Sequence, residues 1–479
     1  MENIELKANH KQGLILGKKD GKIITLPLDS YFNNNITVVG SSGSMKTISF
    51  VLTNILQLVH LGKSIICTDP KGEIYRKTSY MLRKKGYTVK VFNLCDMTHS
   101  DRFNPLAQNE TINDVQVSTE VIITNTQNKI KGDEFWPRAE ENLLKAFEFY
   151  FLEKSLKTNS LKDVYFKIAS GDVADIDNMF RKLPLDSPAR MSYNIFSSGS
   201  DTIKASVLTG LGTRLQAFQN KHVQDLTSEN DIDLELPGKE KCAYFCITSD
   251  MTSTYDFLSS LFYVFLFSKL VKYADSKENG KCDVGVYFLL DEFANIGQIP
   301  DFNKKISTVR SRDINLIPIV QNIGQFQNRY PNGLADEIIG NCDTRLCLAA
   351  NDTLTAEYFS SLLGVATAEN QSIRTEAGID GTLNFGQKNV GSIKRNLLNS
   401  DEILRLPANK LLVNLRGNKP LLLDKMIYTE HPLANELRDN PISEYKPSWN
   451  KNIKEIPMDI EENVKVVFNK KQNMDWNMF

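Results

Sequence analysis

Eight consecutive residues near the start of the chain have the types and the order that phosphate binding requires. Backbone N–H groups of a glycine-rich turn, next to the positive N-terminus of a helix, bind phosphate oxygens. This turn follows the apolar run 36–39 and precedes an apolar helical segment at about 46–60. In such a site the lysine neutralises the β- and γ-phosphates of a nucleotide, and the hydroxyl that follows it ligates Mg²⁺. The predicted nucleotide-binding residues are Gly40, Ser41, Ser42, Gly43, Ser44, Met45, Lys46 and Thr47.

Met45 departs from the phosphate-loop pattern G-x-x-x-x-G-K-S/T, which has glycine at this position. Glycine relieves steric crowding where the backbone curls around a phosphate. Met45 is therefore expected either to lower nucleotide affinity or to shift the loop. The alternative for the whole segment is a plain strand-to-helix turn, but the apolar run before it, the helix after it and the Lys46-Thr47 pair favour a phosphate site.

Two acids, Asp291 and Glu292, follow the apolar run 286–290. At the carboxyl edge of a parallel sheet, the first acid can bind Mg²⁺ through water and the second can deprotonate an attacking water. We assign Asp291 to the metal and Glu292 to the general base. Paired acids also end strands without any function, and it is the combination with Lys46 and Thr47 that predicts hydrolysis of ATP with Mg²⁺.

Two further polar residues flank the apolar run 314–320. Gln321 follows the run, where an amide beside the two acids can sense the γ-phosphate. Arg310 precedes it, together with Arg312, in a helical segment. An arginine that reaches a neighbouring subunit stabilises charge in the transition state, whereas the alternative for each arginine is a solvated surface charge.

Apolar runs of four to seven residues recur before helical segments, which predicts βαβ units and a mainly parallel sheet. Strand signals nearly vanish between 107 and 240, where helical periodicity predicts an inserted all-α domain. The predicted division is a nucleotide-binding domain at 1–106, the all-α insertion at 107–240, the rest of the nucleotide-binding domain at 241–440 and an extension at 441–479. The predicted strands are 36–39, 64–67, 87–92, 243–248, 285–290, 314–320, 344–349 and 411–415.

Three other segments have distinct composition. Residues 366–400 are rich in Gly, Asn and Ser, which predicts a long surface loop or hairpin, and the polar 441–479 predicts a peripheral or partly disordered extension. The apolar stretch 257–271 is interrupted by Ser and Lys and is shorter than a bilayer requires, which predicts a buried helix.

The charge balance argues against a protein that holds nucleic acid by a global positive field, and the cysteine pattern argues against a structural metal site. Lys and Arg number 57 against 58 Asp and Glu, so no global positive field holds nucleic acid and any DNA contact must come from a local patch. The 7 cysteines are scattered, as in proteins of a reducing compartment. Cys242 and Cys246 have a spacing that metal sites use, but no second Cys/His pair accompanies them, and we expect no structural metal.

Segments spread over most of the chain resemble the coupling proteins of type IV secretion and conjugation, the TraG/VirD group. Residues 69–73 (Asp-Pro-Lys-Gly-Glu) resemble the DPKGE signature of that family, 102–106 its NPL segment, and Phe135-Trp136 its FW pair. Other matching segments follow in the family's order: 290–297, 310–312, Gln321, 351–352, 355–357 and 401–403.

This resemblance implies a RecA-like P-loop ATPase that pumps DNA, with Arg310 offered across a subunit interface and Gln321 as the sensing glutamine. It also implies a homo-hexameric ring, with single-stranded or nicked DNA, a relaxase and channel components of the secretion system as partners. Members usually begin with transmembrane helices, and the 39 residues before Gly40 are not membrane-like. Either the membrane anchor is a separate subunit or the protein acts from the cytosol, so we expect a cytoplasmic protein recruited to the inner face of the membrane.

Two motif segments have structural interpretations. The turn 69–73 is expected to connect a strand to a helix, with Asp69 as a cap, more than to contact phosphate. Trp136 is expected in the core.

The function has two alternatives. One is a DNA pump of the FtsK/HerA type, unconnected to secretion. The other is an adaptor that recruits substrate without turnover.

Overall fold

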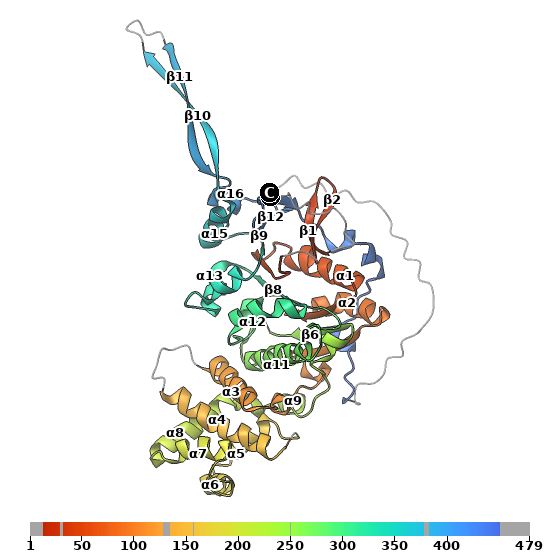
Figure 1. Cartoon of the computed structure of the whole chain (residues 1–479), viewed down its shortest axis with the longest axis vertical. Coiled ribbons are helices and arrows are strands. Elements are labelled where there is room, and N and C mark those ends of the chain that lie inside the picture. Colours follow the sequence, from red (N-terminus) through yellow and green to blue (C-terminus); the bar gives the residue numbers. More distant parts are fainter. Residues whose placement is uncertain are drawn as a thin grey trace.

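The computed structural model describes residues 13–28, 32–127, 135–156, 158–249, 251–377 and 383–450. Their main element is an 11-stranded sheet, with helices on both faces and a helical body below it (Figure 1). In spatial order the strands are β2 (Lys22–Pro27), β1 (Gly13–Lys19), β13 (Leu421–Asp424), β12 (Lys410–Leu415), β9 (Thr344–Ala349), β3 (Ile36–Gly40), β8 (Ile314–Val320), β7 (Val286–Leu290), β4 (Ser64–Thr68), β6 (Cys242–Ile247) and β5 (Thr88–Asn93).

The strands from β9 to β5 are all parallel, which confirms the predicted α/β class with a mainly parallel sheet. Every residue of β3, β4, β6, β7 and β8 is buried, as expected for parallel strands covered on both faces. Val39 of β3 is in register with Val320 of β8 and Cys347 of β9. The segments that follow β3, β8 and β7 therefore start at one edge of the sheet.

The other strands form an antiparallel extension that was only partly predicted. β12 was predicted, and it pairs antiparallel with β9 and β13. β1, β2 and β13 were missed; β1 pairs antiparallel with both β2 and β13. The extension therefore joins the start of the described chain to a segment near its end.

Each face of the sheet has its own hydrophobic core, as the alternation of strand side chains requires. α1 (Leu52–His60) and α2 (Glu73–Lys84) cover one face. The other is covered by α11 (Asp256–Asp275), α12 (Phe302–Thr308) and the helices α13 (Ile323–Arg329), α14 (Leu334–Gly340) and α15 (Thr353–Leu363). Among the described residues α11 alone has the length and composition of a membrane span, and it lies mostly buried in this core, as predicted.

Between β5 and β6 the described residues form helices and short turns without any strand. The core of these helices is continuous with that of the sheet, because α3 packs against both α11 and α4. The limits of the predicted all-α domain stay a prediction. The helices are α3 (Ile112–Thr126), α4 (Phe135–Glu153), α5 (Leu161–Ala169), α6 (Val173–Arg181), α7 (Pro188–Ser197), α8 (Asp201–Arg214), α9 (Lys221–Leu226) and α10 (Leu236–Lys239).

Two peripheral segments complete the fold. β10 (Val365–Ala377) and β11 (Leu383–Asn396) form a separate two-stranded hairpin that projects from the body beside α16 (Ser400–Leu404), so the hairpin alternative is correct (Figure 1). The described start of the predicted extension packs on the body: Tyr445 is buried, and Trp449 Nε1 donates to Ser100 O at 2.8 Å. Residues 451–479 lie outside the described residues.

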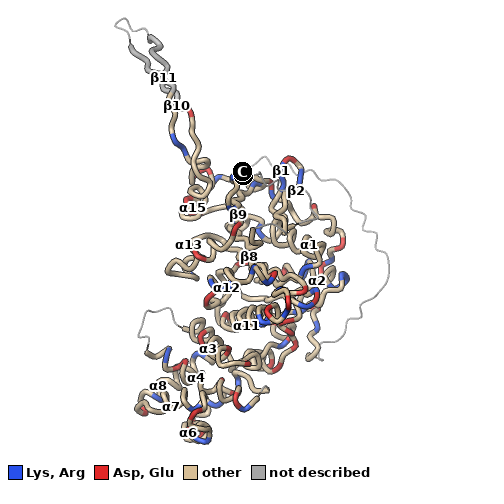
Figure 2. The backbone as a smooth tube through the Cα atoms, viewed as in Figure 1, with Lys and Arg blue, Asp and Glu red and all other residues tan. Residues whose placement is uncertain are grey.

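Basic and acidic residues are interspersed over the body (Figure 2).

Candidate nucleotide site

The loop after β3 requires glycine at two positions. A Cβ on Gly40 would lie 2.5 Å from Ser44 Oγ and 3.1 Å from Leu348 Cβ, so the strand end has no room for a side chain. Gly43 has a φ of +76°, in the left-handed region that glycine adopts without strain. The loop leads into η1 (Lys46–Val51), a π-helical turn that continues directly into α1. π-Helical turns of this kind are frequent at functional sites.

Met45 adopts a left-handed backbone, with a φ of 67° and a ψ of 25°. For a residue with a side chain this conformation costs about 1–2 kcal/mol. Its carbonyl oxygen accepts from both Ser49 N and Ser49 Oγ, each at 2.8 Å. The loop is thus held in a glycine-like conformation at a position that lacks glycine.

Lys46 lies in the centre of the site and is nearly buried. Its Nζ donates to Gly40 O at 2.7 Å and lies 3.4 Å from Glu292 Oε1. The other carboxylate oxygen of Glu292 accepts from Gln321 Nε2 at 2.9 Å. Glu292 itself has a left-handed backbone, with a φ of 51°, which turns it out of the end of β7. The predicted cation, base and sensing amide therefore form one connected group.

Thr47 and Asp291 form the second contact across the site, with Thr47 Oγ1 donating to Asp291 Oδ2 at 3.0 Å. Burial raises the pKa of Asp291 to about 6, and the charge of Glu292 acts in the same direction, against the opposing effect of Lys46. A hydroxyl and a carboxylate that meet in this way supply the oxygen donors that Mg²⁺ takes in proteins. The pair therefore fits the predicted metal site.

Asp69 has the expected structural role and a place in the site as well. Its Oδ2 accepts from Tyr75 N at 2.8 Å in the first turn of α2. Burial raises its pKa to about 6, although backbone N–H groups oppose this shift and Asp291 adds to it. A cavity of about 290 Å³ brings this cap together with the predicted residues. It is lined by Ser42, Thr47, Asp69, Pro70, Lys71, Glu73, Ile74, Asp291, Glu292, Asn295 and Gln321.

Arg310 lies apart from these residues. It is exposed in η6 (Val309–Arg312), which precedes β8, whereas Gln321 follows β8. The seven residues of β8 span about 23 Å at about 3.3 Å per residue. Arg312 instead forms a two-pronged ion pair with Asp275 at 2.7 and 2.9 Å. The structure thus does not bring Arg310 to the site of its own chain.

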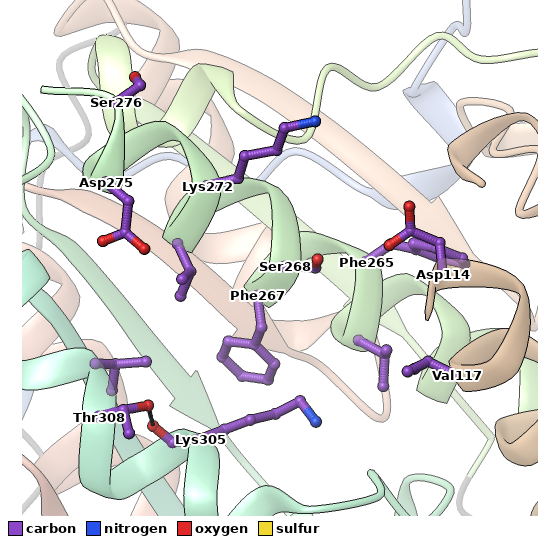
Figure 3. A pocket seen from close by; sticks show the side chains of 13 residues that line it. Asp114, Val117, Phe265, Phe267, Ser268, Lys272, Asp275, Ser276, Lys305 and Thr308 are labelled. Carbon is purple, nitrogen blue, oxygen red and sulfur yellow. Dashed lines mark hydrogen bonds between the residues drawn. The ribbon is translucent and has the colours of Figure 1, made fainter. Parts of the chain in front are cut away.

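A larger hollow of about 640 Å³ lies close to η6, between α3, α11 and α12 (Figure 3). Phe267 and Lys305 point into it, and Thr308 and Val309 are among the residues that line it. None of the residues that line the phosphate-loop cavity contributes to it. The two cavities are therefore separate features of the molecule.

The expectation of a core Trp136 is wrong. Trp136 is 39% exposed and Phe135 49% exposed, and the two rings contact each other edge to face. Both lie in the first turn of α4, ahead of Glu140, the first buried residue of this helix. Trp136 lines a cleft between helices instead.

Sequence reasoning also missed a residue that contacts the loop from far along the chain. Lys425 Nζ donates to Ser44 O at 2.9 Å and to Ala408 O at 2.7 Å. Its position directly after β13 offered no local signal, because the contact exists only when the antiparallel extension is assembled.

Fold and site together define a RecA-like P-loop nucleotide-binding protein. Solved structures support the fold. Unbound TrwBdeltaN70, a bacterial conjugative coupling protein, has a TM-score of 0.62 at 15% identity and covers 89% of this chain and 92% of its own. VirB4 of Thermoanaerobacter pseudethanolicus has a TM-score of 0.52 at 14% identity, covering 89% and 99%.

The chain belongs to the family described as type IV secretory system conjugative DNA transfer, whose model matches residues 3–457. Protein VirD4 of Rhizobium radiobacter is 24% identical over 436 residues, which are 87% of this chain and 60% of VirD4. The conjugal transfer protein TraG of the same organism is 24% identical over 456 residues, 88% of this chain and 66% of TraG. The chain thus spans about three-fifths of the VirD4 protein that it matches.

Proposed function

We propose that this chain is an ATP-hydrolysing coupling protein that recruits a relaxase–DNA substrate and moves DNA into a type IV secretion channel. The observation that carries the proposal is the convergence of Lys46, Thr47, Asp291, Glu292 and Gln321, from segments after three parallel strands, in a member of the conjugative DNA transfer family. TrwB, which shares the fold, has been solved with an ATP analogue and with ADP and Mg²⁺.

Each residue has a distinct part in this reaction. The loop N–H groups and Lys46 hold the phosphates, and Thr47 and Asp291 would hold Mg²⁺, which supplies charge neutralisation when bound. Glu292 accepts the proton of the attacking water, and Gln321 fixes the orientation of its carboxylate. Lys46 forms an ion pair with Glu292. Bound phosphates attract Lys46 and so weaken this ion pair. Glu292 can therefore accept a proton from water only when nucleotide is bound.

The assembly and its partners belong to the same proposal. Arg310 acts in the site of a neighbouring subunit, within a homo-hexameric ring. The ring binds single-stranded or nicked DNA together with its relaxase and meets components of the secretion channel. It works on the cytoplasmic side of the membrane, recruited there through a membrane anchor.

The test is phosphate release by the purified protein, with and without single-stranded DNA. Lys46→Ala should abolish nucleotide binding or turnover, because it removes the cation of the loop. Glu292→Gln should bind ATP and fail to hydrolyse it, because the amide accepts no proton. Lys63→Ala is the matched control, since Lys63 pairs with Asp313 at the opposite end of the sheet. Full activity in Lys46→Ala would overturn the proposal; ATP binding without turnover by the parent would support the adaptor alternative.

A further inference from the structure

Lys425 is a buried cation tied to the phosphate loop from the far end of the chain. Lys425 is 6% exposed, and its ammonium group donates to the carbonyl oxygens of Ser44 and Ala408 at 2.9 and 2.7 Å. Ser44 belongs to the loop, and Ala408 to the segment before β12. Lys425 thus links the antiparallel extension to the predicted phosphate site.

The charge of Lys425 has no carboxylate partner within the described part of the chain, where its hydrogen bonds are to carbonyl oxygens. Other lysines nearby differ: Lys410 pairs with Asp424 at 2.8 Å, and Lys46 lies 3.4 Å from Glu292. A buried cation without a counter-charge is costly, and burial lowers the pKa of Lys425. Anionic phosphates bound to the loop N–H groups would bring negative charge to the opposite side of the same peptide.

The contact with Ser44 O controls the backbone at Met45. The Ser44 carbonyl and the Met45 N–H belong to one planar trans peptide, in which they point in opposite directions. A hydrogen bond that fixes this oxygen therefore fixes the direction of the Met45 N–H. The next peptide is fixed as well, because Ser49 donates twice to Met45 O. Met45 keeps its left-handed φ of 67° between these two anchors.

The anchor itself is rigid. Lys425 N donates to Asn409 O at 2.7 Å, which continues the pairing of β12 with β13. Thr53 Oγ1, on α1, donates to Met426 O at 3.1 Å. Strand pairing and the helix that follows the loop thus hold the residue on both sides, so the ammonium position is set by the fold and not by a flexible side chain alone.

From these contacts we infer that Lys425 is a positioning residue of the phosphate loop: it holds the left-handed Met45 that stands where the loop pattern has glycine, and it adds a second positive charge for nucleotide phosphates. The inference rests on the proposed function, because it needs a nucleotide at this loop. Lys425 touches the loop backbone and not the group that is transferred. Its loss should therefore affect nucleotide affinity more than the rate of turnover.

The experiment measures binding of a fluorescent ATP analogue to the full chain of the parent and of five variants, which include Met45→Gly and its combination with Lys425→Met. Lys425→Met should weaken binding about tenfold, with kcat at saturating ATP changed by less than about twofold. Lys410→Met, in the same strand pair, is the matched control and should bind as the parent does. In a Met45→Gly background the loss from Lys425→Met should shrink to about threefold or less, because glycine needs no support in the left-handed region. Lys46→Ala reports on the proposed function.

The outcomes distinguish failure of the inference about Lys425 from failure of the proposed function. Parent affinity in Lys425→Met, or an equal loss with methionine and with glycine at position 45, overturns the inference. If Lys425→Met does not fold, Lys425→Gln, which keeps an N–H donor without the charge, should lose about threefold, and parent affinity in that variant overturns the inference equally. If the parent binds no nucleotide, or Lys46→Ala binds as the parent does, the proposed function fails first. Loss in Lys46→Ala alone leaves the proposed function standing without a role for Lys425.

Discussion

Met45 shows how a single residue departs from a motif while its backbone conforms to it. The residue has the left-handed conformation that glycine provides in the usual loop, and hydrogen bonds from Ser49 to its carbonyl oppose the strain. The motif therefore specifies a backbone conformation, and hydrogen bonds can hold a residue other than glycine in that conformation.

At this position we expect Met45→Gly to preserve or raise nucleotide affinity. Glycine relieves a strain of about 1 kcal/mol in the loop, although it also enlarges the conformational freedom of the unfolded chain. Titration with a fluorescent ATP analogue measures the effect. A tenfold fall in affinity, about 1.4 kcal/mol, would mean that the loop depends on the methionine side chain.

The carboxyl of Asp291 predicts a dependence of stability on pH in the protein without nucleotide. Its pKa is raised to about 6, chiefly by burial and then by Glu292, from an ordinary value of about 4. The folded state therefore holds this proton more tightly than the unfolded chain does. This contribution to stability is present below about pH 4 and is lost as the pH rises through about 6.

Asp291→Asn tests this dependence, because the amide carries no charge at any of these pH values. At pH 7.5 the variant should have a higher Tm than the parent, and the difference should shrink at pH 5, where the parent carboxyl is mostly protonated. Thermal unfolding without nucleotide or Mg²⁺ gives both values. The same variant should lose Mg²⁺-dependent turnover. Buried charges at functional sites often lower stability, so removing one frequently raises stability while function is lost. A Tm difference that is constant between the two pH values would contradict the shifted pKa.

At the scale of elements, the sequence predicted every strand that is buried along its whole length, namely β3, β4, β6, β7 and β8. The run 286–290 is wholly apolar because helices cover both sides of β7, and such runs are recognisable without knowledge of the partner strand. In β1 the apolar run is short, Leu14 to Leu16, and glycines flank it. A Cβ on Gly13 would lie 1.8 Å from Leu26 O, and Gly17 is next to an irregularity in the pairing with β2. Glycine weakens the local strand signal.

The residues of the candidate site likewise include some that the sequence predicted and one that it did not. Asp291, Glu292 and Gln321 were predictable because they come directly after recognisable strands. Lys46 and Thr47 were predictable because they begin the helix after the glycine-rich loop that follows β3. Parallel order places these strand ends together. Lys425 was not predictable, because its contact with Ser44 depends on pairing between strands that are far apart in the sequence. Local patterns contain no information on which distant segments pair.

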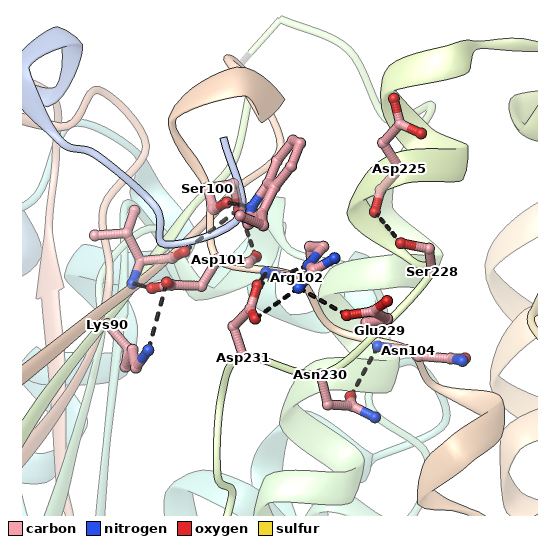
Figure 4. Close-up of polar contacts among 12 residues, drawn as sticks. Lys90, Ser100, Asp101, Arg102, Asn104, Asp225, Ser228, Glu229, Asn230 and Asp231 are labelled. Atoms are coloured by element: carbon pink, nitrogen blue, oxygen red, sulfur yellow. Dashed lines mark hydrogen bonds and ion pairs between the residues drawn. The ribbon is translucent and has the colours of Figure 1, made fainter. Parts of the chain in front are cut away.

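One cluster joins the helical region to the sheet, and it provides a prediction for these elements. Arg102, where the chain leaves the sheet, forms a two-pronged ion pair with Asp231 on the returning segment, at 2.9 and 3.0 Å (Figure 4). Its guanidinium also lies over the Trp449 ring. Although burial raises the pKa of Asp231, hydrogen bonds and the charge of Arg102 outweigh this and hold it below its usual value.

Arg102→Met should destabilise the protein by about 3 kcal/mol, because it removes the charge and the two side-chain hydrogen bonds that hold a largely buried carboxylate, which keeps the hydrogen bond from the main-chain N–H of residue 102. Arg312→Met is a matched control: the geometry of its pair with Asp275 is similar, but Asp275 is 50% exposed, so the expected loss is below about 1 kcal/mol. Urea unfolding of both variants makes the comparison. Equal midpoints for the two would show that the Arg102 cluster does not secure the helical region.

At the scale of the whole molecule, one predicted residue has no place in the site of its own chain. Arg310 is exposed before the first residue of β8, while Lys46 and Glu292 lie beyond the other end of the sheet. A strand of about 23 Å separates the two regions. A catalytic role for Arg310 therefore requires a second subunit, which makes the arginine a test of assembly.

Arg310→Ala should leave ATP binding nearly unchanged and remove turnover, because the arginine contacts charge that develops only in the transition state of a neighbouring site. Mixing makes the prediction specific. Arg310→Ala subunits keep Glu292, and Glu292→Gln subunits keep Arg310, so a mixed ring contains some junctions at which both groups are intact. Two inactive proteins should then partly regain phosphate release when they are mixed, whereas Lys46→Ala subunits mixed with Glu292→Gln subunits should not, because neither kind has a complete site of its own. If labelled subunits are shown to share rings and no activity returns with Arg310→Ala, the arginine does not act across an interface, and the ring mechanism loses the residue that requires it.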